Sequence, residues 1–305
     1  MDAGKNSSIL VTGARGFIGR AVRKLLQRKD YSVLALDQAA MEPGAGSVGG
    51  GREIVLDITD AAQLRRIFES REIAGVIHLA AILPTVAQRE PLRATQVNVI
   101  ASANLLEMAR EFGVRRFVFA SSLSAYGTCP ADQMVSEESG AAPVDVYGAS
   151  KLYIEQLGTA YRERFGLEFV SSRIGRVVGP GARSTTSAWR SQIFELLCTK
   201  ESIEISIPYV DSERLLLVHV EDVARALVTL LRADRVRHSV YNAPCESVAV
   251  ADLKREVERL NSRVNVRVGD ACATCNPRLV DWSRFREEFG IEVMPIFERL
   301  ARAAD

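Results

Sequence analysis

The chain has 305 residues, of which 47% are hydrophobic and 25% charged, a composition typical of a globular protein with a large core. Its formal net charge of +1 gives no electrostatic argument for binding nucleic acid or an anionic membrane surface. No apolar run is long enough to span a bilayer, and the polar first eight residues lack the apolar stretch of a secretory signal. We therefore expect a cytoplasmic protein that binds neither nucleic acid nor membrane.

Short apolar runs alternate with longer amphipathic segments in the first half of the chain. Three segments have the apolar spacing of helices: Ile18–Lys29, Ala61–Arg71 and Leu92–Phe112. The runs predict buried strands, because each is short, apolar and bounded by turn residues, at Ser8–Val11, Ser32–Leu36, Ile54–Leu56, Gly75–Leu79 and Phe117–Ala120. Asp60 and Gly113 are expected to cap the second and third helices. The alternation predicts an α/β fold, a Rossmann-type doubly wound parallel sheet.

A further long helix is expected over Tyr147–Phe165 and a strand near Leu167–Arg173. Five glycines in Pro43–Gly51 indicate a surface loop. Beyond Gly179 the pattern weakens, and helices are expected at Ser187–Cys198, Asp222–Leu231, Val250–Leu260, Ser283–Phe289 and Ile296–Ala303. We divide the chain into a nucleotide-binding domain over 1–174 and a smaller, partly interleaved C-terminal substrate lobe over 175–305.

A glycine-rich segment with the spacing GxxGxxG follows the first strand and opens the first helix. Gly13 permits the tight turn, Gly16 lets the backbone approach a pyrophosphate, and Gly19 lets helix and strand pack closely. The N-terminus of the helix presents free N–H groups and its positive dipole end to the phosphates. The segment is expected to bind a dinucleotide through these glycines together with Arg15, Phe17 and Ile18.

Asp37 ends the second predicted strand, where a carboxylate accepts hydrogen bonds from the adenosine ribose hydroxyls. A 2′-phosphate at that place would meet like charge. Arg15 is the residue that favours NADP, but the three residues after Asp37 add no positive charge. We therefore predict NAD as the cofactor.

Tyr147 and Lys151 form a YxxxK motif, and on a helix these two positions lie on one face. A nearby ammonium stabilises phenolate, so we expect Lys151 to lower the pKa of Tyr147 toward the working pH. The phenol then exchanges a proton with a substrate oxygen while a hydride moves to or from nicotinamide.

Serine hydroxyls in SSLSAYG at 121–127 directly follow the predicted strand Phe117–Ala120. Open parallel sheets bind ligands at the carboxyl ends of their strands. These hydroxyls are therefore candidates for contacting a substrate, although serines also cap turns, and we expect some of the three to do so.

Together the motifs resemble the extended short-chain dehydrogenase/reductase family, in its nucleotide-sugar epimerase/dehydratase group. The resemblance covers essentially the whole chain, and the motifs occur in the family's order. They are TGARGFIG at 12–19, Asp57-Ile58, HLAA at 78–81, Asn98 in VNVIASANLLE, SSLSAYG at 121–127, YGASK at 147–151, RIGRVVGPG at 173–181 and HVEDVARAL at 219–227.

The resemblance implies roles for particular residues. Ser122 would polarise the substrate oxygen beside Tyr147 and Lys151, which also contact the cofactor. Asn98 would support the active-site helix and belong to the cofactor site. The remaining cofactor contacts would be Asp57 and Ile58 at the adenine, and Leu79, Ala80 and Ala81 along the cofactor. The long helices near Leu92–Phe112 and Tyr147–Phe165 would pair in a homodimer as a four-helix bundle.

Departures from the family pattern narrow the chemistry. Sugar dehydratases carry an acidic pair directly after the serine, whereas this chain has Leu123 and Ser124, which serve as neither acid nor base. Epimerase-reductases add a cysteine or histidine beside that serine, and this chain has neither there. What remains is reversible hydride transfer at one carbinol carbon, as 4-epimerisation with retained NAD or as net dehydrogenation.

Arg176 stands where many nucleotide-sugar enzymes have an asparagine near the substrate phosphates. The run Arg173-Ile174-Gly175 resembles uronate and aldonate dehydrogenases, and HLAAIL at 78–83 resembles dehydrogenases of small hydroxy acids. An arginine here suits a carboxylate as well as a diphosphate, and a surface ion pair is the alternative interpretation.

Three functions stay open. An NDP-hexose 4-epimerase, which the family signature slightly favours, would use a substrate set of Ser122, Ser124, Arg176, Arg214 and Arg278. An NAD-dependent dehydrogenase of a free sugar, uronate or hydroxy acid is the second, and a non-catalytic NAD-sensing protein the third. The intact serine, tyrosine and lysine argue against the third.

Five cysteines, an odd number at scattered positions, indicate free thiols in a reducing compartment. Cys272 and Cys275 form a CxxC pair. A structural zinc site needs a second pair of ligands, and a redox motif needs a thioredoxin-like context, and the sequence offers neither. We therefore expect no metal site and treat the spacing as coincidental.

Overall fold

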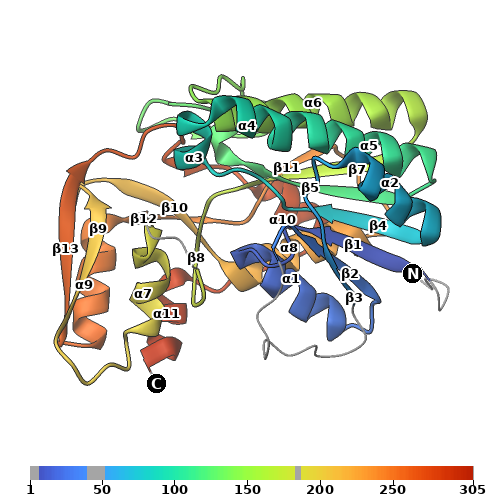
Figure 1. Ribbon diagram of the computed structural model, residues 1–305. Coiled ribbons are helices and arrows are strands. Elements are labelled where there is room, and N and C mark those ends of the chain that lie inside the picture. The colour runs from blue at the N-terminus through green and yellow to red at the C-terminus, as the bar shows by residue number, and fades with distance from the viewer. Residues whose placement is uncertain (1–6, 40–51, 183–186, 305) are drawn as a thin grey trace.

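A seven-stranded parallel sheet forms the centre of the protein (Figure 1). The computed structural model describes residues 7–39, 52–182 and 187–304, so the predicted loop Pro43–Gly51 lies outside the described residues. The strand order is β11-β7-β5-β4-β1-β2-β3, and every neighbouring pair is parallel. The order reverses between β1 (Ser8–Thr12) and β4 (Ile73–His78), which confirms the predicted doubly wound sheet.

Successive residues of each central strand face two different cores. In β1, Ile9 and Val11 pack into one core while Leu10 packs into the other. Both faces of the sheet are therefore buried, which explains why its strands are continuous apolar runs in the sequence. The other strands of this sheet are β2 (Val33–Asp37), β3 (Arg52–Val55), β5 (Arg116–Ser122), β7 (Glu168–Ile174) and β11 (Val240–Asn242).

Helices cover both faces of the sheet. One face is covered by α2 (Ala61–Ser70), α5 (Ser102–Glu111) and α6 (Val146–Phe165), and the other by α1 (Phe17–Gln27), α8 (Val220–Arg232) and α10 (Ser283–Phe289). Asp60 caps α2 as expected, because its side chain accepts a hydrogen bond from the backbone N–H of Gln63. Gly113 follows the end of α5 with a positive φ of 67°, a conformation that suits glycine.

The predicted helix Leu92–Phe112 is interrupted in the structure. It consists of α4 (Pro91–Thr95), a π-helical turn η1 (Gln96–Ala101) and α5. A short helix that the sequence did not predict, α3 (Pro84–Arg89), precedes it. Single π turns inside α-helices often occur at functional sites, and this one carries the buried Asn98.

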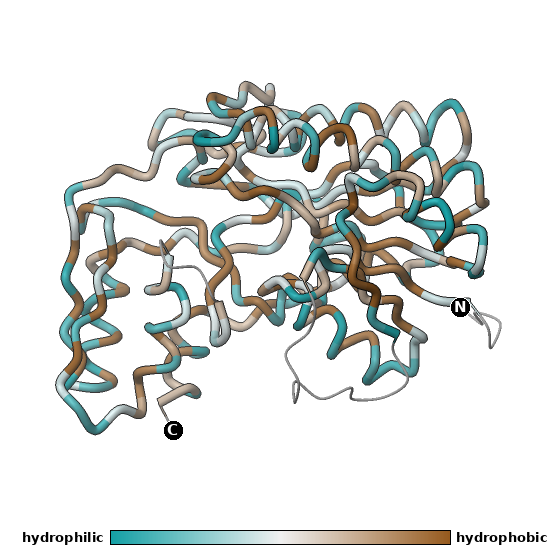
Figure 2. The backbone as a smooth tube through the Cα atoms, viewed as in Figure 1, coloured by the Kyte–Doolittle hydropathy of each residue, from teal (hydrophilic) through white to brown (hydrophobic). Residues whose placement is uncertain are grey.

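The C-terminal lobe has its own apolar core. Figure 2 shows the hydrophobic residues as brown stretches along the strands and helices of the lobe. A three-stranded sheet combines β8 (Arg176–Val178), β10 (Arg214–His219) and β12 (Glu246–Ala249), and β9 (Ile203–Tyr209) pairs with β13 (Val264–Ala271). Its helices are α7 (Trp189–Glu195), α9 (Val250–Leu260) and α11 (Ile296–Ala304). A two-stranded parallel pair links β6 (Met134–Val135) with β14 (Leu279–Val280).

The chain crosses between the two parts more than once. After residue 174 it enters the lobe through β8, yet β11 later joins the main sheet beside β7, and α8 and α10 cover that sheet. A division into two domains at residue 174 stays a prediction. In the described part of the chain, no helix is long and apolar enough to cross a membrane.

Candidate active site

The glycine-rich loop connects β1 to α1. Gly13 has a positive φ of 63°, and a Cβ there would lie 2.8 Å from the backbone nitrogen of Ala80, so a larger residue does not fit. A Cβ on Gly19 would collide with the carbonyl oxygen of Gly13. Gly16 has more space than Gly13 and Gly19. Among the described residues, a Cβ on Gly16 would meet one neighbour, the carbonyl oxygen of Gly13 at 3.0 Å. Since no side chain caps the start of α1, the loop offers open backbone and N–H groups that fit a dinucleotide phosphate.

The two predicted adenosine contacts have different surroundings. Asp37 ends β2 beside the glycine-rich loop, and its Oδ2 accepts a hydrogen bond of 2.9 Å from the backbone N–H of Arg15. Asp57 lies beyond β3, and its Oδ1 accepts hydrogen bonds from the N–H and hydroxyl of Thr59. Ile58 is buried in the core. The geometry orients Asp37 toward the glycine-rich loop. The role of Asp57 stays a prediction.

A buried histidine connects three elements under the cofactor loop. His78 Nδ1 lies 2.6 Å from Thr12 Oγ1, and its Nε2 lies 2.8 Å from Ser102 Oγ. Thr12 Oγ1 also accepts the N–H groups of Leu79 and Ala80, which with the next residue form the half-buried loop predicted to line the cofactor. Burial lowers the pKa of His78 to about 3, so the imidazole is neutral near pH 7.

Asn98, in the π turn, joins the loop after β4 to the helix that carries the tyrosine. Its Oδ1 accepts a hydrogen bond of 2.7 Å from Ile82 N, and its Nδ2 donates to Ile82 O and to Ser150 Oγ. The Ser150 hydroxyl in turn donates to the carbonyl of Tyr147 at 2.7 Å. The structure thus places Asn98 where it positions α6, and a direct cofactor contact stays a prediction.

Ser122, Tyr147 and Lys151 come together at the carboxyl end of β5. Ser122 ends that strand, and its side chain interacts with the phenol of Tyr147, which lies in the first turn of α6. Lys151, one turn further along, is buried, and its Nζ donates to the carbonyl of Ala120 at 2.7 Å. The same Nζ lies 5.5 Å from the centroid of the Tyr147 ring.

The expected lowering of the tyrosine pKa is wrong for this structure. Burial raises the pKa of Tyr147 to about 12, although the hydrogen bond from Ser122 and the charge of Arg190 act in the opposite direction. Burial also lowers the pKa of Lys151 to about 7. Removal from water disfavours the charged form of both groups. Lys151 donates its hydrogen bond to the backbone carbonyl of Ala120 in β5 and not to the phenol of Tyr147.

The other two serines have structural partners, as expected for some of the three. Ser121 Oγ donates to the carboxylate of Glu155, which lies further along α6 than Tyr147. The N–H of Ser124 donates to Ser122 Oγ, which caps the short turn η2 (Leu123–Ala125), and Ser124 Oγ donates to Asn276 Oδ1 at 3.3 Å. Ser122 therefore has two functions, since it caps this turn and also contacts Tyr147.

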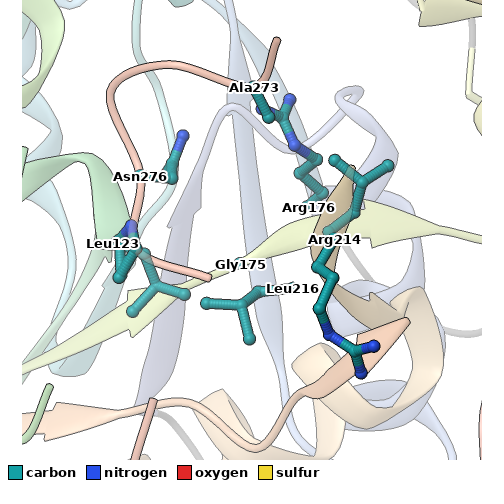
Figure 3. Close-up of a pocket in the computed structure, with 9 residues that line it drawn as sticks. Leu123, Gly175, Arg176, Arg214, Leu216, Ala273 and Asn276 are labelled. Atoms are coloured by element: carbon teal, nitrogen blue, oxygen red, sulfur yellow. The ribbon is translucent and has the colours of Figure 1, made fainter. Parts of the chain in front are cut away.

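A cavity of about 260 Å³, including its opening to solvent, lies next to this turn (Figure 3). Arg176, at the start of β8, is one of its walls, and its guanidinium carbon is 4.8 Å from the centroid of the Tyr209 ring. Among the described residues, no carboxylate pairs with Arg176. The cavity is lined by Leu123, Gly175, Arg176, Arg214, Leu215, Leu216, Ala273, Asn276 and Pro277.

The two other predicted substrate arginines differ in their surroundings. Arg214 also lines the cavity, but its guanidinium donates to the hydroxyl and carbonyl of Ser247 and lies well apart from that of Arg176 in Figure 3. Arg278 does not line the cavity, and its Nε lies 2.6 Å from the carboxylate of the buried Glu213. The charge of Arg278 is therefore already balanced within the fold.

Sequence reasoning missed Arg190, which lies on α7 and is half-buried. Burial, and then the like charge of Arg176, lower its pKa, and it also interacts electrostatically with Tyr147. Nothing in its neighbours along the chain marks it, because the contacts come from distant segments.

The CxxC pair lies at the edge of the same region. Cys272 is exposed, while Cys275 is half-buried and has a positive φ of 67°. Both thiols are free. Across residues 7–39, 52–182 and 187–304, no group of three or more His, Cys, Asp or Glu side chains is arranged to hold a metal ion.

Comparison with known proteins agrees with this geometry. The family model described as NAD dependent epimerase/dehydratase matches residues 9–243. Uronate dehydrogenase of Pseudomonas syringae pv. tomato is 31% identical, over 60% of this chain and 64% of that protein. L-threonine dehydrogenase from Cupriavidus necator superposes with a TM-score of 0.86 and 25% identity, covering 97% of this chain and 99% of the other.

A second solved structure carries the cofactor. MoeE5, in complex with UDP-glucuronic acid and NAD, superposes with a TM-score of 0.79 and 29% identity over 97% of each chain. The predicted enzyme class and the predicted NAD cofactor are thereby confirmed. The chain belongs to the NAD dependent epimerase/dehydratase family, whose members are NAD-dependent epimerases and dehydrogenases of the extended short-chain type.

Proposed function

We propose that the chain is an NAD-dependent dehydrogenase that oxidises the carbinol carbon of a small hydroxy acid or sugar acid. The observation that carries this proposal is Arg176, whose guanidinium lies in the wall of the cavity beside the Ser122 turn without a described carboxylate partner. A guanidinium binds a carboxylate through two parallel hydrogen bonds.

The three residues at the end of β5 and the start of α6 have separate tasks in this proposal. Ser122 Oγ holds the substrate oxygen, and Tyr147 exchanges the proton of the substrate hydroxyl. Lys151 fixes the position of β5 relative to α6 through its bond to Ala120. NAD, when bound along the glycine-rich loop, supplies the hydride acceptor.

The described part of the site offers no residues for a reaction beyond this transfer of one hydride and one proton. Leu123 and Ser124 follow Ser122 in the turn η2, and Ser124 is engaged with Asn276. Elimination of water needs an acid and a base next to the reacting carbon. Reversible oxidation at one carbon needs only one group that exchanges the hydroxyl proton, which Tyr147 supplies, so it fits the residues in place.

The alternative is a nucleotide-sugar 4-epimerase. It is favoured by Arg214, a second arginine in the wall of the cavity that is free to contact a diphosphate in place of Ser247. In an epimerase the hydride returns to the substrate, so no NADH accumulates.

Product analysis separates the two functions. Purified protein is incubated with NAD and, in turn, uronates, aldonates, small hydroxy acids, L-threonine, UDP-glucose and UDP-galactose. We expect stoichiometric NADH from an acid and no interconversion of the UDP-sugars, with Tyr147→Phe as the inactive control. Interconversion of UDP-sugars without net NADH would overturn the dehydrogenase proposal.

We also propose that the chain forms a homodimer in the cytoplasm through the face of α4, η1, α5 and α6, which lie side by side in Figure 1. Large apolar side chains are exposed on this face, including Leu92 at 73%, Ile100 at 54%, Tyr153 at 52% and Phe165 at 55%. Exposed apolar residues gathered on one face favour a protein interface. The resemblance to family homodimers supports the same face.

A further inference from the structure

Arg190 lies close to Arg176 although fourteen positions separate them in the sequence. Arg190 is the second residue of α7, and its carbonyl accepts the N–H of Gly179 at 3.0 Å. Gly179 directly follows β8, which begins at Arg176. This backbone contact ties the start of α7 to the end of β8 and holds the two arginines in one region.

Two tyrosines share this region with the arginines. Tyr209, at the end of β9, presents its ring to the guanidinium of Arg176 at 4.8 Å and interacts electrostatically with Arg190. Its ring packs edge-on against Trp189 at 6.4 Å, which fixes its orientation. Arg190 also interacts electrostatically with Tyr147. The charge of Arg190 therefore acts on the proton-exchanging phenol, and Arg176 lies over the ring of Tyr209 in the same region.

The charges of the two arginines are not balanced by the fold. Both are half-buried, and the like charge of Arg176 lowers the pKa of Arg190. Among the described residues, no carboxylate forms an ion pair with either. The arginines that the described structure buries most deeply each have a carboxylate partner: Arg23 with Glu53, Arg116 with Glu168, and Arg173 with Glu155. Adjacent unpaired cations away from water are costly, and a bound anion removes that cost.

A cationic group on the ligand has no comparable partner here. The described walls of the cavity contain no acidic residue. Asp145 lies near Tyr147, but its Oδ1 accepts the N–H of Gly148 at 2.6 Å and caps α6. An ammonium group would therefore meet two guanidinium charges, which the carboxylate of Asp145, engaged at the start of α6, offsets only in part.

We infer that Arg190 and Arg176 together bind the anionic group of the substrate, and that this substrate is a hydroxy acid or sugar acid without an amino group. The inference rests on the proposed function, because it assigns the substrate class of the same site. Arg190 is the specificity-determining residue of this site. Its position relative to Tyr147 sets the distance between the anionic group of the substrate and the reacting hydroxyl.

Calorimetric titration of the NAD-saturated protein tests the inference without relying on turnover. The probes are D-glucuronate, 2,3-dihydroxybutanoate, L-threonine, D-glucose and UDP-glucose. L-Threonine and 2,3-dihydroxybutanoate share one carbon skeleton and differ in the amino group, so they form a matched pair. We expect at least one amino-free acid to bind, and 2,3-dihydroxybutanoate to bind more tightly than L-threonine.

Variants then assign the anion to the two arginines. Arg190→Gln and Arg176→Gln should each weaken binding of the acid about tenfold to a hundredfold, the usual effect of losing a hydrogen bond to a charged group. Arg190→Lys, which keeps the charge, should recover part of the affinity. The matched control is Arg259→Gln, which removes an exposed arginine of α9 that pairs with Glu256 in the same lobe. Thermal unfolding of each variant shows that the fold is retained.

Separate outcomes contradict the inference and the proposed function. Wild-type affinity for the acid in Arg190→Gln, or tighter binding of L-threonine than of 2,3-dihydroxybutanoate, would overturn the inference while leaving NADH formation from an acid in place. Failure of every acid to bind, with UDP-glucose binding that depends on both arginines, would assign the pair to phosphate and overturn both.

Discussion

Tyr147 is the residue whose hydroxyl meets both Ser122 and the charge of Arg190. Substitution Tyr147→Phe removes the proton-exchanging oxygen and keeps the ring in its place. We expect turnover to fall by about two to four orders of magnitude, the usual contribution of a positioned general acid or base. NAD affinity should change little, because the variant keeps the aromatic ring and leaves the glycine-rich loop unchanged. Initial rates of NADH formation and fluorescence titration with NAD measure the two effects, and wild-type turnover in the variant would remove Tyr147 from the mechanism.

His78 makes the stability of the protein depend on pH. Burial holds its pKa at about 3 in the folded state, against about 6.5 in an unfolded chain. Between these values the unfolded state binds one more proton, so the free energy of unfolding falls as the pH falls below about 6.5. The slope from this residue is at most about 1.4 kcal/mol per pH unit, and above pH 6.5 the contribution is constant.

Urea unfolding at pH 7.5, 5.5 and 4.5 measures this dependence in the wild-type protein and in His78→Gln. Carboxylates that titrate in the same range are common to both proteins, so the difference between them isolates the histidine. The variant should be less stable at pH 7.5, and its disadvantage should shrink as the pH falls. Parallel curves for the two proteins would show that His78 does not carry the effect.

At the scale of elements, the π turn η1 brings the side-chain amide of Asn98 to the backbone of Ile82 and to Ser150. Asn98→Ala removes both partners of the Ile82 backbone and the contact to Ser150. We expect the free energy of unfolding to fall by about 2 kcal/mol, because buried backbone groups are left without partners. Turnover should also fall, since α6 loses its support beneath Tyr147.

Ser150→Ala is the comparison for this prediction. It removes one contact of Asn98 and leaves both bonds to Ile82 in place. Urea unfolding and kcat should therefore show a clearly smaller loss than in Asn98→Ala. Equal losses in the two variants would mean that the loop after β4 does not depend on Asn98.

The elements that sequence alone predicts are those whose stabilising pattern is local. The strands of the main sheet are bounded apolar runs, and Asp60 caps α2 by accepting a backbone N–H three residues away, so both are visible in a short window. The π turn has no such signal, because its extra residue is fixed by Asn98 contacting Ile82 and Ser150. Strand β11 has three residues, and its place beside β7 depends on a partner about seventy positions upstream.

The candidate site follows the same division. Gly13, Tyr147 and Lys151 belong to compact motifs, so their types and spacing were sufficient to place them in one region. The sequence does not show which arginines of the site are paired with carboxylates. Arg278 is neutralised by Glu213, sixty-five positions away. Arg190 comes close to Arg176 only through the packing of α7 on β8. The pKa of Tyr147 also could not be predicted from spacing, because it depends on burial by segments distant in the sequence.

At the scale of the whole molecule, the surface of α4–α6 is the feature that the folded chain leaves unexplained. Tyr153 is 52% exposed on α6, whereas the next two residues of that helix, Ile154 and Glu155, are buried. If two copies pair through this face, Tyr153→Asp places a charge in an apolar interface without a partner, which is strongly unfavourable. We expect the variant to be monomeric at concentrations at which the wild type is dimeric.

Size-exclusion chromatography with light scattering measures the mass of each protein directly. Met134→Asp is the matched control, because Met134 is 58% exposed on β6 and lies outside the helical face. The control should stay dimeric, which separates a specific interface from a general effect of surface charge. The monomeric variant should also unfold at a lower temperature, and that temperature should no longer rise with protein concentration, because dimerisation stabilises the folded chain by mass action. A dimer of unchanged stability in Tyr153→Asp would place the interface elsewhere on the molecule.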